Sequence, residues 1–400
     1  MIYKSENKSQ FKEIPLVLQK PAFDSELTSI IIDLEKLRVK ELGGPVPAYI
    51  FFQIKNIFHI LESLGSARIE GNNTTLSEFI ERVIDRTSKE TKDEKLREIF
   101  NIERAIGFIE EQVDEHTVIN RALVSDVHKI IVDGLTPPPD GEGSRYPGTL
   151  RPINVSVQKS SLVPPDSIRV PEYFEELLAF TNKKNESKYD LLTTALAHHR
   201  MAWIHPFDNG NGRLIRMFTY ALLIKQGFKV KSGRILNPTA IFCMDRNEYY
   251  DMLAFADTGQ EEHLLQWCTY VLRGLLKEIQ KIDRLLNLDY MTNEILLPAL
   301  SYALDRAHIT PREHDILRTV VKNENMLIKS ADLDSIIGRE SPIQRSRIIR
   351  GLKEKGMLFS PFKEKGRRYT IGFTNNYFLR GIIRILEEKS FIPEFLNQSK

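Results

Sequence analysis

The stretch Ile204–Arg216, IHPFDNGNGRLIR, combines an imidazole, a carboxylate, two glycines and two guanidiniums in a single short segment. Apolar residues at helical spacing precede it in TTALAHHRMAWI and follow it in LIRMFTYALLI. This pattern indicates a helix–loop–helix. Because Asn-Gly is also a strong turn signal, a purely structural hairpin turn is the alternative. The helical flanks favour a loop that leads directly into a helix.

The glycines of this loop predict an anion-binding site. Gly210 and Gly212 bracket Asn211, and glycine allows the backbone to turn tightly and to approach a ligand closely. Free N–H groups at the start of the following helix would then point at one anion. Arg213 and Arg216 are three residues apart on one face, so both guanidiniums can reach the same phosphate oxygens. The pattern is typical of a polyphosphate site, although the sequence contains no P-loop motif.

Residues just before the glycines are candidate catalytic and metal-binding groups. His205 can exchange a proton near neutral pH, so it is the candidate general base toward a hydroxyl that attacks phosphorus. Asp208 and Asn209 offer oxygens to Mg²⁺, which needs only one or two protein ligands when phosphates supply others. His198 and His199 lie on the preceding helical stretch, where packed or exposed histidines are a simpler interpretation than a metal site.

Composition limits the class of protein. The chain has 400 residues and a formal net charge of +2, so several domains are expected and the molecule as a whole is not a polycation. Residues 311–400 carry 18 Lys and Arg against 11 Asp and Glu, which leaves residues 1–310 acidic. The only cysteines are Cys243 and Cys268, whose apolar neighbours predict buried thiols in a reducing compartment. No signal peptide or apolar run of membrane-spanning length is visible, so the expected location is the cytoplasm.

Apolar periodicity predicts a mainly α-helical chain. Helical stretches before residue 300 are expected at 24–37, 48–64, 76–89, 93–115, 119–134, 171–183, 189–202, 213–226 and 260–283. One exception is 145–165, where Ile153, Val155 and Val157 alternate with polar residues between prolines and glycines. That segment predicts a surface flap, either a short β-hairpin or a plain connecting loop.

After Pro311 the pattern changes to three short helices followed by two strands. The helices are expected in PREHDILRTVVKN, KSADLDSIIG and SPIQRSRIIRGLKEKG, and the strands in MLFSPFKEKGRRYTIGF. This order is that of a winged helix-turn-helix, with Ser341 as N-cap of the third helix. Basic residues are expected to be exposed on that helix and at the wing: Arg345, Arg347, Arg350, Lys363, Lys365, Arg367 and Arg368. DNA binding and a protein-docking or dimerisation role are both compatible with this charge.

The opening loop resembles the signature of Fic (Fic/Doc) proteins, His-x-Phe-x-Asp/Glu-Gly-Asn-Gly-Arg-x-x-Arg. The matching positions are His205, Phe207, Gly210, Asn211, Gly212, Arg213 and Arg216. The resemblance implies a helical bundle that transfers AMP from ATP, with Mg²⁺, to a Ser, Thr or Tyr hydroxyl of a target protein. It implies His205 as the base and the glycine turn on the α- and β-phosphates, with the two arginines on the outer phosphates. The signature's acidic metal ligand is Asn209 here, and its uncharged amide is expected to lower Mg²⁺ affinity.

A second resemblance concerns SARIEG, which runs from Ser66 to Gly71. It is similar to the inhibitory motif Ser/Thr-x-x-x-Glu-Gly/Asn of Fic proteins with an N-terminal inhibitory helix. The resemblance implies that Glu70 pairs with Arg216 at the place of the γ-phosphate, so that ATP binds unproductively.

Two further elements match the family's arrangement. The flap 145–165 lies where Fic proteins place a hairpin that pairs with an extended segment of the target protein. Tyr249 and Tyr250, in RNEYYDML, resemble an element near the adenine. Packing in the core is an equal alternative for both rings.

These interpretations divide the chain into an N-terminal helical region with the inhibitory motif (1–110), a Fic catalytic domain (111–295), a winged-helix domain (305–380) and a C-terminal helix or tail (381–400). The predicted function is an autoinhibited protein adenylyltransferase that modifies a target protein or itself. One alternative is removal of AMP from modified proteins, with Glu70 positioning a water. Another is a DNA-binding regulator whose Fic domain senses a nucleotide. Likeness to the family also suggests a homodimer.

Overall fold

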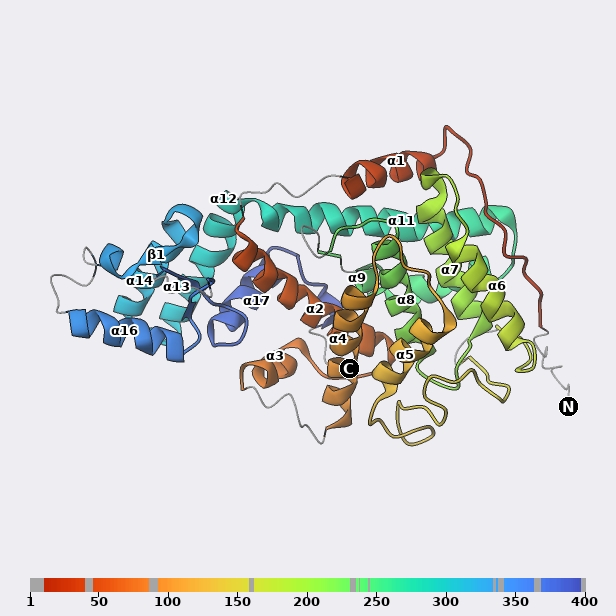
Figure 1. The fold of residues 1–400 in the computed structure, drawn as a ribbon, viewed down its shortest axis with the longest axis horizontal. Helices are drawn as coiled ribbons and strands as arrows, with labels where there is room; N and C mark the ends of the chain where they lie inside the picture. Colours follow the sequence, from red (N-terminus) through yellow and green to blue (C-terminus); the bar gives the residue numbers. More distant parts are fainter. Residues whose placement is uncertain are drawn as a thin grey trace, which may run out of the picture. The chain divides into compact units, whose positions relative to one another are not determined.

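The structure is a computed structural model that describes residues 11–39, 46–85, 93–157, 162–230, 235–236, 238–243, 245–333, 336, 342–362 and 368–396. These residues are mostly helical with one small sheet, as the apolar spacing predicts (Figure 1). They fold into two compact units. The first unit comprises 1–41, 65–72 and 92–278, and the second comprises 42–64, 73–91 and 279–400.

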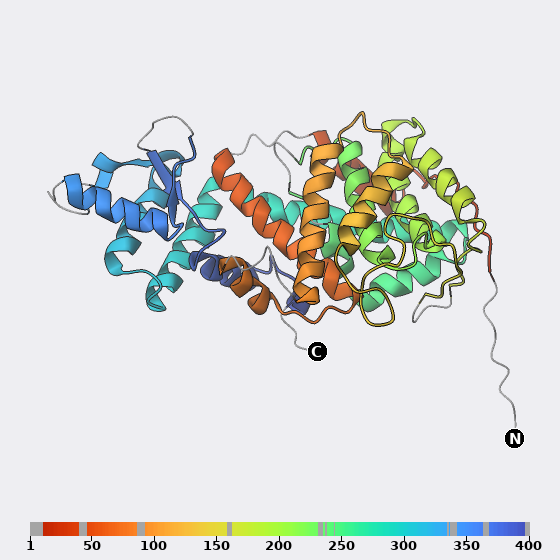
Figure 2. The same cartoon turned by 60° about the horizontal axis from the view of Figure 1, so that its bottom comes forward.

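The first unit is a bundle of helices. Its helices are α1 (Glu26–Val39), the end of α2 (Ala48–Glu70), α4 (Glu94–Gln112), α5 (Arg121–Val132), α6 (Val170–Asn182), the short η2 (Ser187–Tyr189), α7 (Asp190–Ile204), α8 (Asn211–Lys225), α9 (Pro238–Cys243), α10 (Arg246–Ala256) and most of α11 (Glu261–Asp283). In this bundle α8 packs against α4, α5 and α7, and α7 also packs against α6 (Figure 2).

Helix α8 lies at the centre of the first unit. Its side chains from Arg213 to Ile224 are buried on every side, and most of α7 is buried as well. A helix that is buried all round belongs to the interior of a bundle. The loop between α7 and α8 is therefore carried by two interior helices, which fixes its position more firmly than surface helices would.

Helix α7 ends where the sequence changes from MAWI to HPF. Pro206 has no N–H and cannot continue the helix, and it disfavours helical backbone at the residue before it. His205 accordingly takes a left-handed conformation with φ 49°, while its N–H still donates to the Met201 carbonyl at 3.1 Å. This backbone conformation is uncommon for a residue other than glycine.

The flap between α5 and α6 contains no strand within residues 145–157 and 162–165. The predicted alternation at Ile153, Val155 and Val157 therefore does not form a strand ladder in the described residues. Pro152, Pro164 and Pro165 lack the N–H groups that such a ladder needs. The turn of the expected hairpin, 158–161, lies outside the described residues.

The second unit combines helices with a three-stranded sheet. Its elements are the start of α2, α3 (Leu76–Ile84), η3 (Arg284–Leu286), α12 (Leu288–Tyr290), the π-helical η4 (Met291–Leu296), α13 (Leu297–Asp305), α14 (Pro311–Lys322), η5 (Glu324–Met326), β1 (Ile328–Lys329), η6 (Ser330–Leu333), α16 (Pro342–Glu354), β2 (Leu358–Phe359), β3 (Arg368–Ile371), α17 (Phe378–Glu388) and η7 (Glu394–Leu396). The strand order is β1-β3-β2, and both pairs are antiparallel.

The order of elements after Pro311 follows the predicted one in α14, α16 and the β2–β3 pair. Strand β1 was not predicted, because two residues give no periodicity to read. Ser341, Lys363, Lys365 and Arg367 lie outside the described residues, so the cap and most of the basic wing stay predictions. The winged-helix assignment and its DNA contacts likewise remain predictions.

Two expectations from composition concern membranes and thiols. Of the helices in the described ranges, none is both long and apolar enough to span a bilayer. Cys268 is fully buried on α11, and burial raises the pKa of its thiol. The side chain of Cys243 lies outside the described residues.

Candidate active site

The loop between α7 and α8 is held in shape by the side chain of Asn211. Its Oδ1 accepts from the Phe207 N–H at 3.0 Å, and its Nδ2 donates to the Phe207 carbonyl at 2.8 Å. Gly210 precedes the helix with φ 75°, a conformation that favours glycine. Since α8 starts at Asn211, the first N–H groups of the helix have no partner within it and face the space in front. The signature asparagine thus shapes the cradle that the glycines open.

His128 on α5 supports the same loop, and no sequence signal singles it out. Its ring stacks on Phe207 with 3.9 Å between centroids and 14° between planes. The Gly148 N–H donates to its Nδ1 at 2.9 Å, so Nε2 carries the proton and donates to the Asn209 carbonyl at 2.9 Å. Burial lowers the pKa of His128 to about 4, so the ring is neutral near pH 7.

The carboxylate of Glu70 lies in the cradle. A Cβ atom at Gly212 would come within 2.1 Å of Glu70 Oε1, so only glycine allows this approach. Glu70 Oε1 is also 2.8 Å from Nη2 of Arg216, whose side chain is completely buried. Arg216 further donates to the hydroxyl and carbonyl oxygens of Ser66, both at 2.8 Å. The structure therefore brings together the inhibitory segment and the signature, as the resemblance implies.

The backbone at the end of α2 fixes the position of Glu70. Gly71 adopts φ 115°, which ends the helix and lets the Asn72 N–H reach the Ala67 carbonyl at 3.1 Å. Burial raises the pKa of the Glu70 carboxyl. The positive charges of Arg216 and then Arg213 lower it by more, so the pKa lies below its ordinary value. Glu70 is therefore an anion at neutral pH.

Arg216 retains one donor for a further anion. Its Nη1 is buried, and it has no hydrogen-bond partner among the residues that the structure describes. A buried guanidinium nitrogen without a partner is costly, so a ligand oxygen at this position would be stabilising. This donor and the N–H groups of α8 are the groups that could hold the phosphates of a nucleotide.

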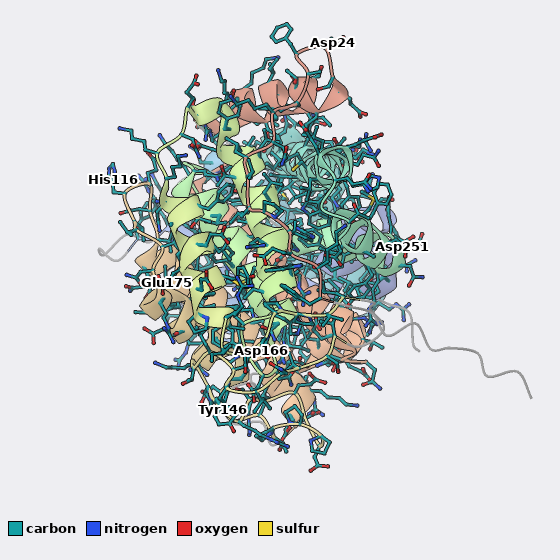
Figure 3. All side chains as sticks on the ribbon, turned by 90° about the vertical axis from the view of Figure 1, so that its right-hand side faces the viewer. Asp24, His116, Tyr146, Asp166, Glu175 and Asp251 are labelled. Atoms are coloured by element: carbon teal, nitrogen blue, oxygen red, sulfur yellow. The ribbon has the colours of Figure 1, made fainter. Side chains whose placement is uncertain are left out.

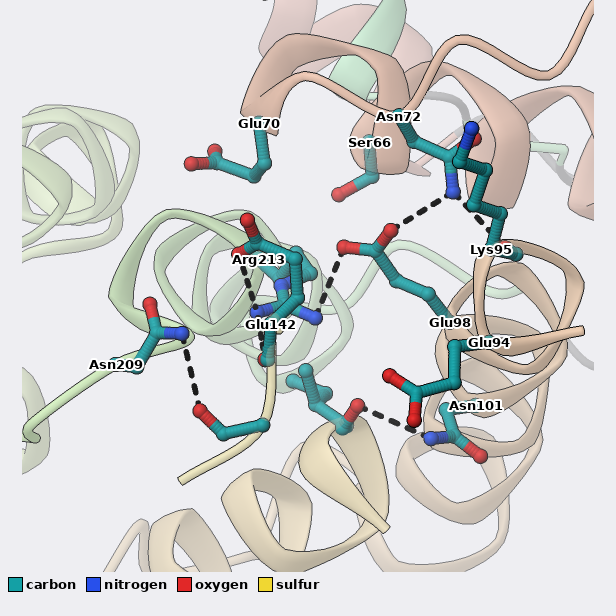
Figure 4. A network of polar contacts seen from close by, with 12 residues as sticks. Ser66, Glu70, Asn72, Glu94, Lys95, Glu98, Asn101, Glu142, Asn209 and Arg213 are labelled. Carbon is teal, nitrogen blue, oxygen red and sulfur yellow. Dashed lines mark hydrogen bonds and ion pairs between the residues drawn. The ribbon is translucent and has the colours of Figure 1, made fainter. Parts of the chain in front are cut away.

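Arg213 is held by two acidic residues that the sequence did not point to (Figure 4). Glu98 on α4 is buried and lies 2.9 Å from Arg213 Nη1. Nη2 donates to the Glu142 carbonyl at 2.6 Å and lies 3.5 Å from the Glu142 carboxylate. Asn72 donates to the other Glu98 oxygen at 2.8 Å, which ties Glu98 to the end of the inhibitory segment. Glu70, Glu98 and Glu142 thus set three carboxylates against two guanidiniums.

His205 is in a protonation state that suits a base. Burial and, after it, the charge of Arg151 lower its pKa to about 4, and the Glu70 carboxylate opposes this effect. A neutral imidazole can accept a proton, whereas an imidazolium cannot. His205 therefore meets the chemical requirement for the predicted base throughout the neutral range.

Asp208 and Asn209 both hold the loop that precedes the flap. Asp208 accepts from the Ser144 hydroxyl at 2.5 Å and from the Arg145 N–H at 2.8 Å, so both of its oxygens are engaged. The Asn209 amide donates to the Gly143 carbonyl at 3.0 Å, a contact visible in Figure 4. No group of three or more His, Cys, Asp or Glu side chains in the described part of the chain could hold a metal ion.

The structure separates the two tyrosines of α10. Tyr249 is buried and its hydroxyl lies 3.0 Å from Nε2 of His198. Tyr250 is 41% exposed, with the Arg246 guanidinium 5.5 Å from its ring centre. Of these two tyrosines, only Tyr250 is accessible to a ligand. His198 also contacts Thr219, and His199 pairs with Asp257 at 2.9 Å, so both histidines are part of the core.

The site therefore combines three features: an anion cradle at the N-terminus of a helix, a neutral histidine beside it, and a carboxylate that lies in the cradle. Residues 118–223 match the Fic/DOC family, and the chain therefore contains a Fic/DOC domain. The chain is similar to "Protein adenylyltransferase Fic" of Drosophila grimshawi, with 27% identity over 205 residues, which is 50% of this chain and 38% of that protein. The protein of the same name in Nematostella vectensis is 29% identical over 205 residues, which is 48% of this chain and 42% of that protein. The chain thus spans less than half the length of these relatives.

Solved structures show the same fold. A Fic family protein from Desulfovibrio desulfuricans G20 superposes with a TM-score of 0.51 at 19% identity, over 88% of this chain and 98% of that one. Fic-1 from C. elegans (residues 134–508) also has a TM-score of 0.51, at 18% identity, over 64% of this chain and 71% of that one. At these identities the likeness establishes the architecture and leaves the chemistry to be argued from the site.

Proposed function

We propose that the chain is a protein adenylyltransferase that transfers AMP from ATP to a hydroxyl of a target protein or of the chain itself. The observation that carries this proposal is the carboxylate of Glu70 in the cradle, bonded to Arg216, beside a neutral His205. An anion of the chain itself occupies a site built for the anion of a ligand. The names of the relatives support the same reaction.

The reaction follows from the positions of these groups. ATP would place its α- and β-phosphates at the turn Gly210–Gly212, where N–H groups of α8 and the guanidiniums meet the charge. The target hydroxyl attacks the α-phosphorus, and His205 takes the hydroxyl proton as the new P–O bond forms. The bond between the α-phosphorus and the bridging oxygen breaks, and pyrophosphate leaves. Tyr250 is the candidate for contact with the adenine.

Autoinhibition is the second part of the proposal. While Glu70 holds Arg216, a γ-phosphate meets a carboxylate at the position where it needs a cation. The two anions repel, so ATP is held in a position unsuited to in-line attack. Removal of Glu70 frees both the space over Gly212 and the guanidinium.

Magnesium stays a prediction in this scheme. Each Asp208 oxygen accepts one hydrogen bond, from the Ser144 hydroxyl and from the Arg145 N–H, and each keeps a lone pair that could face a metal ion. Asn209 could offer its amide oxygen, a neutral ligand that Mg²⁺ accepts when phosphates supply charge. No step above depends on this ion.

The test is mass spectrometry after incubation with ATP and Mg²⁺. We expect AMP adducts on the Glu70→Gly variant, few on the native protein and none on Glu70→Gly with His205→Ala. Loss of AMP from pre-modified protein, dependent on Glu70, would instead support the reverse reaction. No adducts in any variant, despite bound ATP, would contradict transferase activity.

The basic second unit suggests another candidate function, a DNA-binding regulator with a nucleotide-sensing Fic domain. The supporting observation is the exposure of Arg347 and Arg350 on α16. Arg350 is paired with Glu354 at 3.0 Å, which reduces its availability to phosphate. Duplex binding that weakens steeply with salt would support this function. A homodimer is proposed by likeness to the family, and a cytoplasmic location stays the prediction made from the sequence.

A further inference from the structure

Arg151 is a buried arginine whose hydrogen bonds all go to backbone carbonyls. Its side chain lies at the base of the flap with 2% exposure. Nη1 donates to the Ile153 carbonyl at 2.9 Å and Nη2 to the Pro165 carbonyl at 2.5 Å. Nε donates to the carbonyl of His205 at 2.8 Å. One rigid guanidinium therefore contacts both stems of the flap and the predicted base.

Among the described residues of the flap, Asn154 also joins the two stems. Within the described residues the stems form no strand ladder, so side chains must join them. Asn154 does this from the outer side, since its Nδ2 donates to Asp166 at 3.2 Å and its Oδ1 accepts from the Ser167 N–H at 2.7 Å. Figure 3 labels Asp166 at this end of the flap. Arg151 and Asn154 together close the neck of the flap.

The carbonyl that accepts from Arg151 Nε belongs to His205, whose backbone conformation needs support. His205 has the left-handed φ of 49°, which a residue other than glycine keeps only when its surroundings hold it. The Arg151 N–H donates to the Pro206 carbonyl at 2.9 Å, so two consecutive carbonyls of the signature loop are bound by one residue. The orientation of the imidazole follows from this backbone, because its first side-chain bond starts there.

We propose that Arg151 is a positioning residue that couples occupancy of the flap by an extended segment of a target protein to the placement of His205. Any displacement of the stems when a strand of the target adds to the flap must act on the same guanidinium that holds the His205 carbonyl. Docking of the target thus orders the base at the moment when a hydroxyl is delivered to it. This inference rests on the proposed transferase function.

Arg151 also affects the charge around His205. Burial and then the Arg151 cation lower the pKa of the imidazole, while the Glu70 carboxylate raises it. Loss of the cation should therefore raise the pKa of His205. A titration therefore shows whether the Arg151 charge acts on His205, and the change in kcat shows whether Arg151 places the base.

The test compares Arg151→Lys, which keeps the charge, with Arg151→Gln, which removes it, both made in the Glu70→Gly background. Both variants lose the three-carbonyl fork, and we expect kcat for transfer to a protein target to fall about 10- to 100-fold, as for a misplaced catalytic group. KM for ATP should stay unchanged, because Arg151 does not contact the cradle. Arg169→Lys, at a half-buried arginine paired with Glu13, is the matched control and should keep the parent kcat.

A second variant and a second readout cover the possibility of poor folding. Asn154→Ala loosens the neck without touching His205, and coupling predicts a lower kcat here as well. NMR titration of the histidine ring protons, with His205→Ala for identification, should show a raised pKa in Arg151→Gln and an unchanged one in Arg151→Lys. The NMR titration needs no transfer activity. It therefore still shows whether the Arg151 charge acts on His205 if the transferase proposal fails.

Three results would overturn the coupling. Parent-like kcat in both Arg151 variants would show that the fork does not place the base. A change in KM for the target alone in Asn154→Ala would show that the flap binds without affecting His205. A His205 pKa that is the same in Arg151→Gln and the parent would reduce Arg151 to a structural contact.

Discussion

Replacement of Glu70 by glutamine isolates the charge that closes the cradle. The change keeps the length of the side chain and removes its charge, while Ser66 still accepts two hydrogen bonds from Arg216. Breaking a buried ion pair costs about 3–5 kcal/mol. The Glu70 side chain is 24% exposed, and Ser66 stays as a hydrogen-bond partner of Arg216. We therefore expect a smaller loss in the free energy of unfolding, about 1–3 kcal/mol.

Under the proposed function, the same interaction opposes ATP in the native protein. ATP must displace or tolerate the carboxylate, so its removal should raise the affinity for ATP by a similar free energy. A gain of about 1–3 kcal/mol corresponds to about 5- to 150-fold tighter binding. The loss in unfolding free energy and the gain in binding free energy should therefore match each other within error.

Calorimetric titration with a non-hydrolysable ATP analogue, paired with denaturant unfolding, measures both quantities. Glu81→Gln is the matched control, since Glu81 pairs with Arg380 within the second unit. Ser66→Ala removes one hydrogen bond to Arg216 but leaves the carboxylate, so it should not tighten binding. If Glu70→Gln were destabilised but bound the analogue no more tightly than the native protein, the carboxylate would not compete with phosphate.

Three further predictions concern the loop and its histidines. Asn209→Asp loses the donor to Gly143 and adds a charge, so Mg²⁺ should bind the ATP-loaded protein more tightly in a metal titration, and an unchanged affinity would place the ligand elsewhere. His128→Ala removes the ring stacked on Phe207 and should lower the unfolding free energy by about 2–4 kcal/mol; a loss below about 1 kcal/mol would mean that the loop does not depend on it. The folded pKa values of His128 and His205 are both about 4, below the ordinary value, so the stability that they contribute as neutral rings is full above about pH 6.5 and is lost as pH falls toward 4. Unfolding titrations from pH 7.5 to 4.5 should show this loss, and His128→Ala should reduce it.

The sequence predicted the helices well where apolar periodicity was long. The bundle around α7 and α8 follows directly from that periodicity, and the end of α7 follows from Pro206. The flap shows the limit of the approach. Alternation of apolar residues predicted a strand at 153–157, but a ladder also needs N–H donors, and the prolines at both stems remove them.

The site was predictable only where its residues lie close together in the sequence. Two short motifs pointed to the glycine turn and to Glu70, which the structure brings together. Glu98, His128 and Arg151 were missed, because each acts on the loop from another segment of the chain and resembles an ordinary buried polar residue in sequence. Asp208 and Asn209 have a further role that their residue types did not suggest, because their hydrogen bonds hold residues 143–145; their predicted role as metal ligands stays a prediction.

Several main-chain atoms of residues 142–148 contact the signature segment or His128 on α5. The Glu142 and Gly143 carbonyls accept from Arg213 and Asn209, the Arg145 N–H donates to Asp208, and the Gly148 N–H donates to His128. The Tyr146 side chain makes none of these contacts, so it can vary without altering the path of this segment. Within a set of divergent homologues, the alignment column for position 146 should therefore look poorly preserved even though the backbone superposes closely.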